Sequence, residues 1–585
     1  MFAGAGSGKT RVLTHRIAHV IATRGVRPSE ICAVTFTNKA AKEMRARLEE
    51  LLGGTLTGMW LGTFHAIGVR MLRRDGDAIG IPPNFTIYDE ADRASALRRA
   101  MRNEGIDEKR NPPARIGHAI SAAKNEMLDA AQYRVRAGNT IEEMVARAYS
   151  AYERELASAA ALDFDDLLMR SVRLLRESDP VREHYQQRFR HLFVDEYQDT
   201  NLAQYTMVSI LAAQYRNLTV VGDDDQAVYG FRGADVRNIL SFRRDYPDAE
   251  HIPLEQNYRS TQGILDVAHS IIRLNPERAE KRLWTERGGG ETPRLISVFD
   301  EQEEALAVAG QIDELIGREG FSLSDCAVLY RTNAQSRAFE EVFLRRAIPY
   351  QLIGGVRFYE RREIRDVLSY LRLIANPRDA VSFGRIVNVP RRRIGDRTVA
   401  ELDALARRRS LSAFEAINDF VTEQSGTPAA AALAAFARLI AGLRDLSGRA
   451  PVPQLLERVV LDSGYRALLQ DGTPEGEERW NNVTELIGLA GEYADLPPPE
   501  GLLQFLENVA LVSDVDSMPD SPAGVTLITL HQVKGLEFPV VFLVGMEEGL
   551  LPHVRAMEEG DAGVAEERRL AYVGITRAQR RIFLV

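Results

Sequence analysis

The sequence has few of the residues that mark disulfide-bonded, membrane-spanning or secreted proteins. Its 585 residues include only two cysteines, Cys32 and Cys326, too few for a disulfide framework or a four-thiolate zinc site. No apolar run approaches the roughly 20 residues that cross a bilayer. The first residues, MFAG, provide no basic region followed by an apolar stretch, as a secretory signal would. We therefore expect a protein of the reducing cytoplasm with no membrane segment.

Lysine is also scarce. The chain has seven lysines among its 74 basic residues, and the others are arginines. A coding bias toward arginine is the plainer explanation for that ratio. In such a background, however, a lysine can mark a site that needs a compact ammonium group rather than a planar guanidinium. The lysines to follow as pointers are Lys9, Lys39, Lys42, Lys109, Lys124, Lys281 and Lys534.

Basic residues as a whole are also fewer than acidic ones. With 74 basic and 83 acidic residues the net charge is −9. Proteins that bind nucleic acid usually carry a basic footprint, so this balance argues weakly against such binding. Net charge, however, governs solubility and long-range steering rather than the chemistry of a local groove. The composition, 45% hydrophobic and 27% charged, is that of an ordinary globular protein.

Short apolar runs alternate with helical patterns in the N-terminal part of the chain. The runs at 31–37, 191–200 and 217–226 are apolar and rich in β-branched residues, and the last two end in acidic residues. Such runs are typical of strands in a buried parallel sheet, whose functional groups gather at the carboxyl ends of the strands. The stretch 85–160 has a helical pattern and predicts an insertion.

A second block of the same kind begins near residue 252. Its predicted strands are apolar runs at 293–299, 325–331, 525–531 and 540–545, and a helical region lies between about 360 and 520. We therefore predict an α/β fold of two cores, each interrupted by a helical insertion. The predicted boundaries are 1–80 and 160–257 for the first core, 81–159 for its insertion, 258–360 and 520–585 for the second core, and 361–519 for its insertion.

Residues 3–10, AGAGSGKT, fit a phosphate-binding P-loop in which alanine replaces the first glycine. Glycines let backbone N–H groups turn toward phosphate oxygens, and the start of the following helix adds a favourable dipole. Lys9 would reach the β- and γ-phosphates, and the Thr10 hydroxyl would bind Mg²⁺. The alternative is a flexible glycine-rich tail. The residues predicted to bind ATP here are Ala3, Gly4, Ala5, Gly6, Ser7, Gly8, Lys9 and Thr10.

A nucleotide site also needs acidic groups, and Asp195 and Glu196 directly follow an apolar run. Asp195 would hold Mg²⁺ through water, and Glu196 would orient and deprotonate the attacking water. The alternative is a solvated acidic turn after a strand. Gln226, at the end of the next run, can sense a γ-phosphate without opposing its charge. Phosphoryl transfer also needs positive charge at the γ-phosphate. Arginine can supply that charge, but chemistry alone does not identify the right one among so many arginines.

The motifs resemble, in order and over nearly the whole chain, those of the superfamily 1A DNA helicases of the UvrD/PcrA/Rep type. The matching segments are AGAGSGKT (3–10), AVTFTNKAAKEMR (33–45), GTFH (62–65), LDFDDLL (162–168), VDEYQDT (194–200), VGDDDQAVYGFRGA (221–234), LEQNYRS (254–260), VLYRTNAQSR (328–337), TLHQVKGLEFPVVF (529–542) and EERRLAYVGITRA (566–578). One such motif would be modest support, whereas ten in order are very specific.

The resemblance implies a role for each matching residue. Glu196, Gln226, Arg259 and Arg577 correspond to catalytic residues, the two arginines reaching the γ-phosphate from the second core. Tyr258 corresponds to the residue that stacks on adenine, and Glu537 lies in a motif that contacts the nucleotide. Thr10 and Asp195 correspond to the metal-binding residues. These implications agree with the chemistry inferred from the residues themselves.

The resemblance also implies a track for single-stranded DNA. Aromatic side chains there stack on bases without regard to sequence, although core packing is the alternative for each aromatic residue taken singly. Thr35, Asn38 and Lys39 follow a strand end and would contact backbone phosphates; Lys9, Lys39 and Lys534 all fall in motifs. The residues predicted to bind DNA are Thr35, Asn38, Lys39, Phe64, His65, Tyr229, Phe231, Arg232 and His531.

Together these features predict two RecA-like P-loop NTPase cores that bind ATP and Mg²⁺ in the cleft between them. The expected activity is ATP-dependent 3′–5′ translocation on single-stranded DNA and unwinding at junctions with duplex. The expected setting is DNA repair or replication in the cytoplasm, at the nucleoid, with repair or replication proteins as partners. Two alternatives stay open: the helicase subunit of a helicase–nuclease complex, and a DNA-binding protein without ATPase activity.

The chain departs from the family pattern in three places. The P-loop begins at residue 3, so we expect no strand to anchor it and no upstream adenine-reading glutamine. The chain ends at residue 585, soon after the last motif, which with the early P-loop predicts a protein incomplete at both ends. The segment NVPRRRIGDRT (388–398) resembles one that grips duplex DNA, but Arg393 stands where the family usually has glycine.

Overall fold

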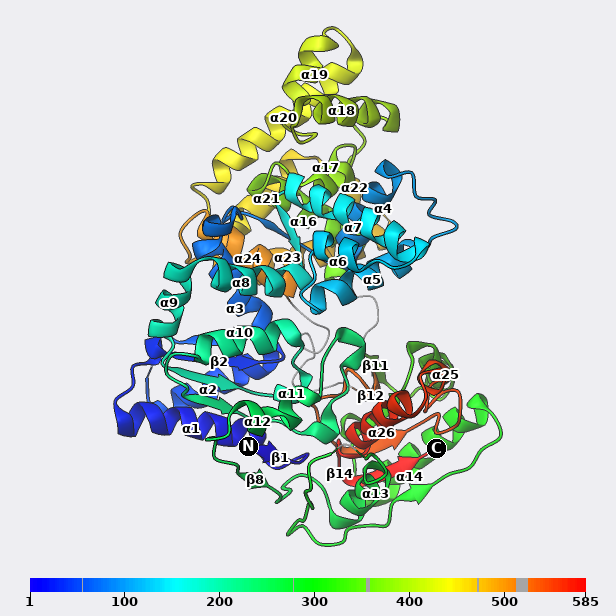
Figure 1. The fold of residues 1–585 in the computed structure, drawn as a ribbon. Coiled ribbons are helices and arrows are strands. Elements are labelled where there is room, and N and C mark those ends of the chain that lie inside the picture. The colour runs from blue at the N-terminus through cyan, green and yellow to red at the C-terminus, as the bar shows by residue number, and fades with distance from the viewer. Residues whose placement is uncertain (55, 277, 354–357, 471–472, 512–523) are drawn as a thin grey trace. The chain divides into compact units, whose positions relative to one another are not determined.

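The computed structural model describes residues 1–54, 56–276, 278–353, 358–470, 473–511 and 524–585 (Figure 1). The chain forms two compact units. The first, here called the sheet unit, comprises Met1–Ile67, Asp179–Gly355 and Ser513–Val585. The second, here called the helical unit, comprises Gly68–Ser178 and Val356–Val512. In the described residues no helix is both long enough and apolar enough to span a membrane.

Within the sheet unit, one four-stranded sheet has the order β3, β2, β6, β7, and all its neighbours are parallel. Strand β2 (Ile31–Thr35) is buried along its whole length, which explains its unbroken apolar sequence. The strands predicted within 31–37, 191–200 and 217–226 are confirmed. The other elements of this part are β3 (Trp60–Thr63), β6 (His191–Val194), β7 (Leu218–Val220), α1 (Lys9–Arg24), α2 (Asn38–Leu52), α3 (Phe64–Asp75), α9 (Asp179–Arg188), α10 (Leu202–Ala212), α11 (Arg237–Leu240) and α12 (Phe242–Asp245).

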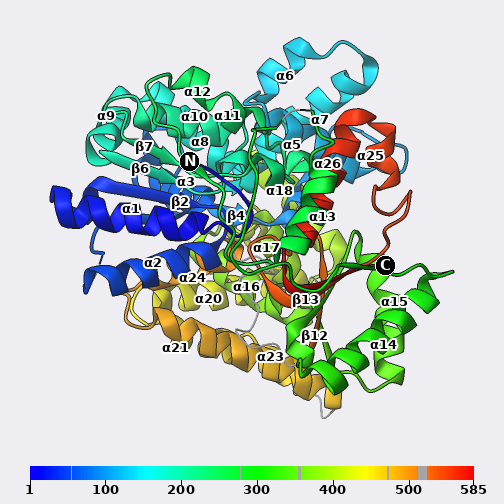
Figure 2. The ribbon, with the colours of Figure 1, turned by 90° about the horizontal axis from the view of Figure 1, so that it is seen from below.

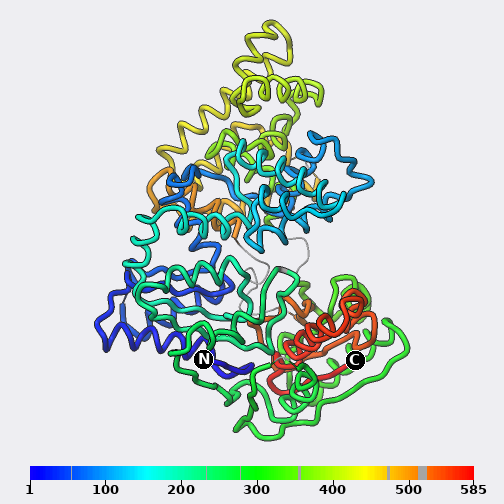
Figure 3. The backbone as a smooth tube through the Cα atoms, viewed as in Figure 1, coloured from blue at the N-terminus to red at the C-terminus, as the bar shows by residue number. Residues whose placement is uncertain are grey.

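A short strand leads into the glycine-rich loop. Strand β1 (Phe2–Ala3) pairs in parallel with β8 (Pro253–Leu254). Figure 3 marks the N-terminus, in dark blue, from which the chain enters this strand. The Ala3 N–H donates to the Gly222 carbonyl at 2.9 Å, and the Gly4 N–H donates to the Leu254 carbonyl at 3.1 Å. The expectation that no strand would anchor the loop is therefore wrong. This short strand is enough to anchor the loop because its backbone is hydrogen-bonded toward Gly222 on one side and toward Leu254 on the other.

A second sheet of the same unit has six strands in the order β11, β12, β10, β13, β14, β9, again all parallel. Along β10 (Cys326–Tyr330), Ala327 and Leu329 face one hydrophobic core, and Val328 and Tyr330 face another. This alternation is the period-two geometry of a strand with both faces covered. The other strands are β9 (Arg294–Leu295), β11 (Tyr350–Leu352), β12 (Val525–Thr529), β13 (Phe538–Leu543) and β14 (Ala578–Leu584).

Helices cover this second sheet on both faces. Helices α13 (Gln262–Ile272) and α26 (Asp561–Ile575) pack side by side (Figure 2) and contribute Ile264, Ala268 and Leu570 to one core. Helices α14 (Glu301–Glu319) and α15 (Ser336–Arg345) pack together and supply the other core, and α25 (Val554–Glu558) packs on α26. The layers place the carboxyl ends of the parallel strands at one edge, where open α/β sheets carry their sites.

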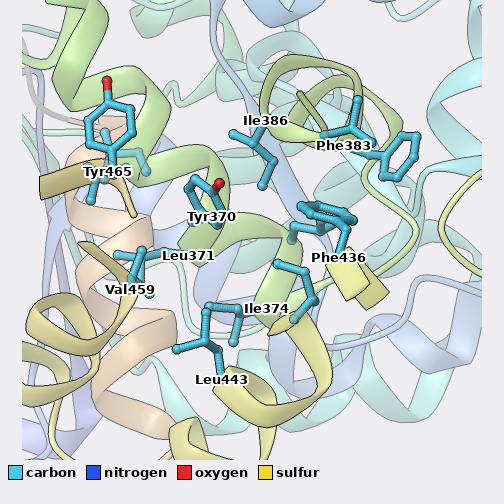
Figure 4. Packing of buried hydrophobic residues seen from close by; sticks show 14 of the residues in the cluster. Tyr370, Leu371, Ile374, Phe383, Ile386, Phe436, Leu443, Val459 and Tyr465 are labelled. Carbon is cyan, nitrogen blue, oxygen red and sulfur yellow. The ribbon is translucent and has the colours of Figure 1, made fainter. Parts of the chain in front are cut away.

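The helical unit is built around α16 (Arg362–Ala375), which is buried on most of its surface. Figure 4 shows Leu371 of this helix beside Val459 of α21, and Ile374 beside Leu443 of α20. The helices predicted within 85–160 and 360–520 are confirmed. They are α4 (Glu90–Asn103), α5 (Pro113–Asn125), α6 (Ala130–Arg136), α7 (Thr140–Ser158), α17 (Ala380–Ile386), α18 (Asp396–Arg409), α19 (Ile417–Glu423), α20 (Pro428–Ser447), α21 (Val452–Asp462), α22 (Tyr465–Leu469), α23 (Pro474–Ala490) and α24 (Glu500–Leu511). Helix α8 (Phe164–Glu177) also belongs to this unit and follows the first of the two stretches.

The two helical segments of the sequence meet inside this unit. Strands β4 (Thr86–Tyr88) and β5 (Ala161–Asp163) pair in parallel at their contact with the second segment. The buried Asn376 amide donates to the Thr86 hydroxyl at 2.9 Å, and the Tyr88 hydroxyl donates to Asp379 at 2.9 Å. Hydrogen bonds between segments nearly 300 residues apart join them into one packed body.

Candidate nucleotide site and nucleic-acid interface

The glycine-rich loop adopts a conformation that requires glycine. Gly6 and Gly8 have φ of +63° and +80°, in the left-handed region. A Cβ on Gly6 would lie 2.6 Å from the Asn257 amide nitrogen and 2.8 Å from Arg259 Cβ. The Asn257 amide donates to the Ala5 carbonyl at 2.6 Å, and the Tyr258 N–H donates to the Gly6 carbonyl at 2.9 Å. The segment 257–259 therefore lies directly against the loop, and α1 begins just beyond it at Lys9.

The predicted phosphate and acid residues meet at the start of α1 and the end of β6. The Lys9 ammonium lies 3.0 Å from the Glu196 carboxylate, and the Thr10 hydroxyl donates to Asp195 at 3.0 Å. Glu196 has φ +49°, an uncommon conformation for a residue with a side chain. These four side chains form a compact group of one ammonium, one hydroxyl and two carboxylates.

The two carboxyls of this group have opposite electrostatic environments. Burial raises the pKa of Asp195 to about 6, and the charge of Glu196 adds to the rise. Burial acts in the same direction on Glu196, but the ammonium groups of Lys9 and Lys534 outweigh it and lower the pKa of Glu196 to about 2. Oxygen ligands are those that Mg²⁺ prefers, so the adjacent Thr10 and Asp195 oxygens fit this ion.

The two predicted arginines reach the same place from different segments: Arg259 lies between β8 and α13, and Arg577 directly precedes β14. Arg577 is 2% exposed and donates to the Gln226 amide oxygen at 3.2 Å. Arg259 donates from Nε to Glu537 at 2.6 Å and from Nη1 to the Thr576 carbonyl at 3.2 Å. Burial, together with the neighbouring Arg259, lowers the pKa of Arg577 to about 9. A negative ligand would relieve this unfavourable environment of the guanidinium.

These residues line one cleft of about 1390 Å³ within the sheet unit. Its wall includes Lys9, Thr10, Glu196, Gln226, Arg259 and Arg577. Tyr258 lies on the same wall with 62% of its surface exposed, so its ring offers a face for stacking. The structure thus brings together all the predicted catalytic residues and most of the predicted ATP-binding ones.

Sequence reasoning missed several residues of this cleft. Lys534, beside the cleft, donates to the Gln226 carbonyl at 2.7 Å and pairs with Asp199; the scarcity of lysine and its place in the 529–542 motif both pointed to it. Asn257 was quoted only as part of a motif. Trp284 and Gln256 also line the wall, and the Tyr258 hydroxyl donates to Gln256 at 3.0 Å. Neither spacing nor composition indicated them.

Four rings from distant parts of the chain form an aromatic cluster. The ring of Tyr229 stacks on Phe36 with centroids 5.3 Å apart, and Phe231 meets His531 edge to face at 5.1 Å. Tyr229 and Phe231 are 6.1 Å apart, and the Lys534 ammonium lies 5.3 Å from the Tyr229 ring. Phe231 is 63% exposed. Three predicted DNA-binding residues are therefore adjacent, and Phe36 is a member that the sequence reading missed.

The other predicted DNA-binding residues have varied positions. Thr35 is buried at the end of β2, where its hydroxyl donates to the Thr37 carbonyl at 3.0 Å. Asn38 and Lys39 form the first turn of α2 and are half-buried. Phe64 is 2% exposed, so it packs in the interior. Two residues complete the set: His65 is half-buried, and the Arg232 side chain lies outside the described residues.

Comparison with known families accounts for almost the whole chain. The model of the UvrD/REP helicase N-terminal domain matches residues 1–247. The model of the UvrD-like helicase C-terminal domain matches residues 252–427 and 430–585. The chain therefore belongs to the UvrD/REP helicase family.

Individual relatives agree with this assignment. The chain is 46% identical over 593 residues to the ATP-dependent DNA helicase PcrA of Leuconostoc citreum, an alignment that covers 100% of this chain and 79% of the relative. It is 45% identical over 588 residues to the ATP-dependent DNA helicase PcrA of Staphylococcus aureus strain MRSA252, covering 100% of this chain and 80% of the relative.

Proposed function

We propose that this chain, an ATP-dependent DNA helicase of the UvrD/REP family, moves 3′–5′ along single-stranded DNA and unwinds duplex at junctions during DNA repair or replication. The observation that carries the proposal is the cleft in which Lys9, Thr10 and Glu196 face Arg259 and Arg577. Hydrolysis needs a phosphate loop, an acidic pair and positive charge at the γ-phosphate. The two alternatives, a helicase–nuclease subunit and an inactive DNA-binding protein, are not favoured, because the relatives named above are helicases aligned over the whole chain.

The four-stranded and six-stranded sheets are, in this proposal, two RecA-like cores. The first would comprise 1–80 and 160–257 with its insertion at 81–159. The second would comprise 258–360 and 520–585 with its insertion at 361–519. Support comes from the lining of the cleft. Glu196 and Gln226 follow strands of the four-stranded sheet, and Glu537 and Arg577 directly precede strands of the six-stranded sheet. Because ATP would contact groups from both cores, its binding and hydrolysis would close and open the cleft.

The residues of the cleft divide the work of hydrolysis. Thr10 and Asp195 would hold Mg²⁺, which when bound neutralises charge on the β- and γ-phosphates. Lys9 would leave its ion pair with Glu196 and bind phosphate oxygens instead. The Glu196 carboxylate would then orient a water molecule and accept its proton. Arg259 and Arg577 would stabilise the charge that develops on the γ-phosphate. Tyr258 would stack on the base of the nucleotide.

The aromatic cluster would form part of the DNA track. A base that stacks on an aromatic ring gains about 1–3 kcal/mol whatever its sequence. Phe231 offers an exposed ring, and Tyr229, His531 and Phe36 support it from three other positions along the chain. Asn38 and Lys39 would contact phosphates beside it, whereas the buried Thr35 hydroxyl bonds to Thr37 within its own turn. With DNA as its track, the protein would work in the cytoplasm, at the nucleoid.

Replacement of Lys9 by alanine tests the proposal. Steady-state ATP hydrolysis is measured with and without single-stranded DNA, and Lys9→Ala is expected to lose at least about 100-fold in kcat because the phosphate charge loses its main cation. Lys109→Ala is the matched control, since Lys109 is an exposed lysine of the helical unit. Hydrolysis that does not respond to DNA, or that survives in the Lys9→Ala variant, would contradict the proposed function.

A further inference from the structure

A buried lysine outside the motifs joins the segment after α13 to the end of β7. The Lys281 ammonium contacts three consecutive carboxylates: it lies 2.6 Å from Asp224, 3.1 Å from Asp225, and also bonds Asp223. The side chain of Lys281 is 4% exposed, and those of the aspartates are at most 2% exposed. The ammonium thus lies at the centre of a buried cluster of carboxylates.

Neighbours of Lys281 in the sequence are hydrogen-bonded to the same carboxylates. The Arg278 guanidinium donates twice to Asp225, at 3.0 and 2.7 Å, and the Ala279 N–H donates to Asp224 at 2.7 Å. Burial opposes the charge on Lys281, but the three carboxylates outweigh it and raise the pKa of the lysine above its ordinary value. The ammonium is therefore charged at neutral pH, and residues 278–281 are docked on the 223–225 turn.

This cluster reaches the nucleotide cleft through Asp223. One carboxylate oxygen of Asp223 accepts from Lys281, and the other accepts from the Gln226 side-chain amide at 2.5 Å. With its NH₂ group held in this way, Gln226 presents its amide oxygen to Arg577 at 3.2 Å. An amide has a donor end and an acceptor end, so fixing the donor end on Asp223 fixes which end faces Arg577.

We propose that Lys281 is a positioning residue for ATP hydrolysis, which acts through Asp223 to hold the Gln226 amide with its oxygen toward Arg577. The inference rests on the proposed roles of Gln226 and Arg577. A compact ammonium suits this place, because three carboxylate oxygens lie within about 3 Å of one nitrogen, whereas a guanidinium spreads its donors over a plane. Without Lys281, Arg278 is left to oppose three buried carboxylates, and the Asp223 oxygen that bonded Lys281 keeps only the Asp225 N–H, at 3.2 Å.

The first test replaces Lys281 in the full chain by methionine and by arginine. Steady-state ATP hydrolysis is measured with saturating single-stranded DNA. Lys281→Met is expected to lower kcat about tenfold, less than the roughly 100-fold loss typical when a direct donor is removed. KM for ATP is expected to change by less than about threefold, since the ground-state phosphate contacts stay in place. Lys281→Arg should recover part of kcat.

The second test turns the Gln226 side-chain amide around while Lys281 stays in place. In Asp223→Asn the side-chain oxygen would face the Lys281 ammonium, so its NH₂ group would face Gln226 and turn the Gln226 oxygen away from Arg577. Because the variant removes one of three crowded carboxylates, it is expected to fold, and kcat should fall about as much as in Lys281→Met. This variant keeps the inference testable if Lys281→Met does not fold.

Two comparisons separate positioning from a general loss of stability. Gln226→Ala combined with Lys281→Met should lose no more in kcat than Gln226→Ala alone, since both changes act on one group. Lys124→Met is the matched control, because Lys124 is a buried lysine that also contacts three carboxylates, in the helical unit. It is expected to lower the melting temperature and leave kcat unchanged.

Several results would overturn the inference while the proposed function stands. They are an unchanged kcat in both Lys281→Met and Asp223→Asn, a multiplied loss in the double variant, or a rise in KM with kcat intact. Absence of DNA-stimulated hydrolysis in the unmodified chain would instead refute the proposed function, and this inference with it.

Discussion

Lys124 in the helical unit and Lys281 in the sheet unit are surrounded in the same way. Lys124 lies 2.9 Å from Glu153, 2.9 Å from Asp163 and 2.8 Å from Asp166, and its side chain is fully buried. Each lysine faces three carboxylates, and each cluster includes one arginine, Arg170 in the first and Arg278 in the second. Both clusters therefore join two basic groups to three carboxyl groups.

The clusters differ in what the carboxylates contact next. In the helical unit, Asp163 accepts from the Tyr152 hydroxyl at 2.9 Å and caps α8, so the cluster fastens α5, α7 and α8 together. In the sheet unit, Asp223 accepts from Gln226, which faces Arg577 in the nucleotide cleft. The same group of charges can thus hold helices together in one place and, in another, connect a distant segment to Gln226, for which we propose a catalytic role.

The largest expected effect comes from breaking the fastening cluster. Lys124→Met should lower the free energy of unfolding by about 3–5 kcal/mol, because it leaves buried carboxylates without their main cation. Urea unfolding followed by circular dichroism measures this change, with the exposed Lys109→Met as the control. A loss below about 1 kcal/mol would mean that the Lys124 cluster contributes little, and the comparison with Lys281 would then fail.

An intermediate effect is expected from the pH dependence of the same cluster. Burial and the charge of Asp163 raise the pKa of Asp166 to about 8, although Lys124 and Arg170 act in the opposite direction. A carboxyl whose pKa is raised on folding stabilises the protein below its unfolded value, and that contribution is lost as the pH rises through the folded value. The protein should therefore lose stability relative to Asp166→Asn as the pH rises.

Asparagine mimics the protonated carboxyl and does not titrate. Between about pH 6 and about pH 8, the stability difference between Asp166→Asn and the unmodified chain is expected to grow by about 2 kcal/mol in favour of the variant. Urea unfolding at both pH values measures it. A difference that is independent of pH would show that Asp166 stays ionised among Asp163, Glu153, Lys124 and Arg170.

The smallest expected effect concerns backbone strain, which also occurs in both units. Glu196 in the cleft and Arg393 in the helical unit both have left-handed φ, of +49° and +63°. Arg393→Gly should raise the free energy of unfolding by about 0.5–1 kcal/mol, because glycine adopts this conformation without the steric cost but loses more entropy on folding. Unfolding in urea measures the gain, and ATP hydrolysis should not change.

The position of Arg393 also explains a departure seen in the sequence. The resemblance predicts glycine there, and Arg393 has the left-handed φ that glycine adopts without steric cost. The neighbouring Arg392 points inward, donating to the Tyr370 hydroxyl at 2.5 Å and the Ser463 carbonyl at 3.2 Å. If Arg393→Gly weakened binding to duplex DNA, the side chain itself, rather than the turn, would be the contact.

Local patterns in the sequence predicted the strands and the groups at their ends. The runs that became β2 and β6 are buried on both faces, so their composition alone marks them, and Asp195 and Glu196 follow directly. The P-loop was equally readable, since Gly6 and Gly8 have conformations that require glycine. These features depend on neighbours in the chain, which is why sequence reasoning reached them.

Contacts between distant segments were not predictable in the same way. Nothing in the spacing pairs Lys281 with Asp223, Phe36 with Tyr229, or the two residues of β1 with Leu254. The net charge of the sequence likewise gave no sign that several aspartates, Asp223 among them, are buried beside lysine or arginine. Such pairings depend on how sheets and helices pack, and a single sequence does not record that packing.

The aromatic cluster has a consequence for how the protein would respond to the base sequence of the DNA it binds. Phe231 and its neighbours offer ring faces, and every base has a face to stack on them. A motor held in this way would register the spacing of successive nucleotides and be indifferent to their identity. The protein would then move along coding and non-coding stretches at the same rate, and that rate would depend on the supply of ATP rather than on the base sequence.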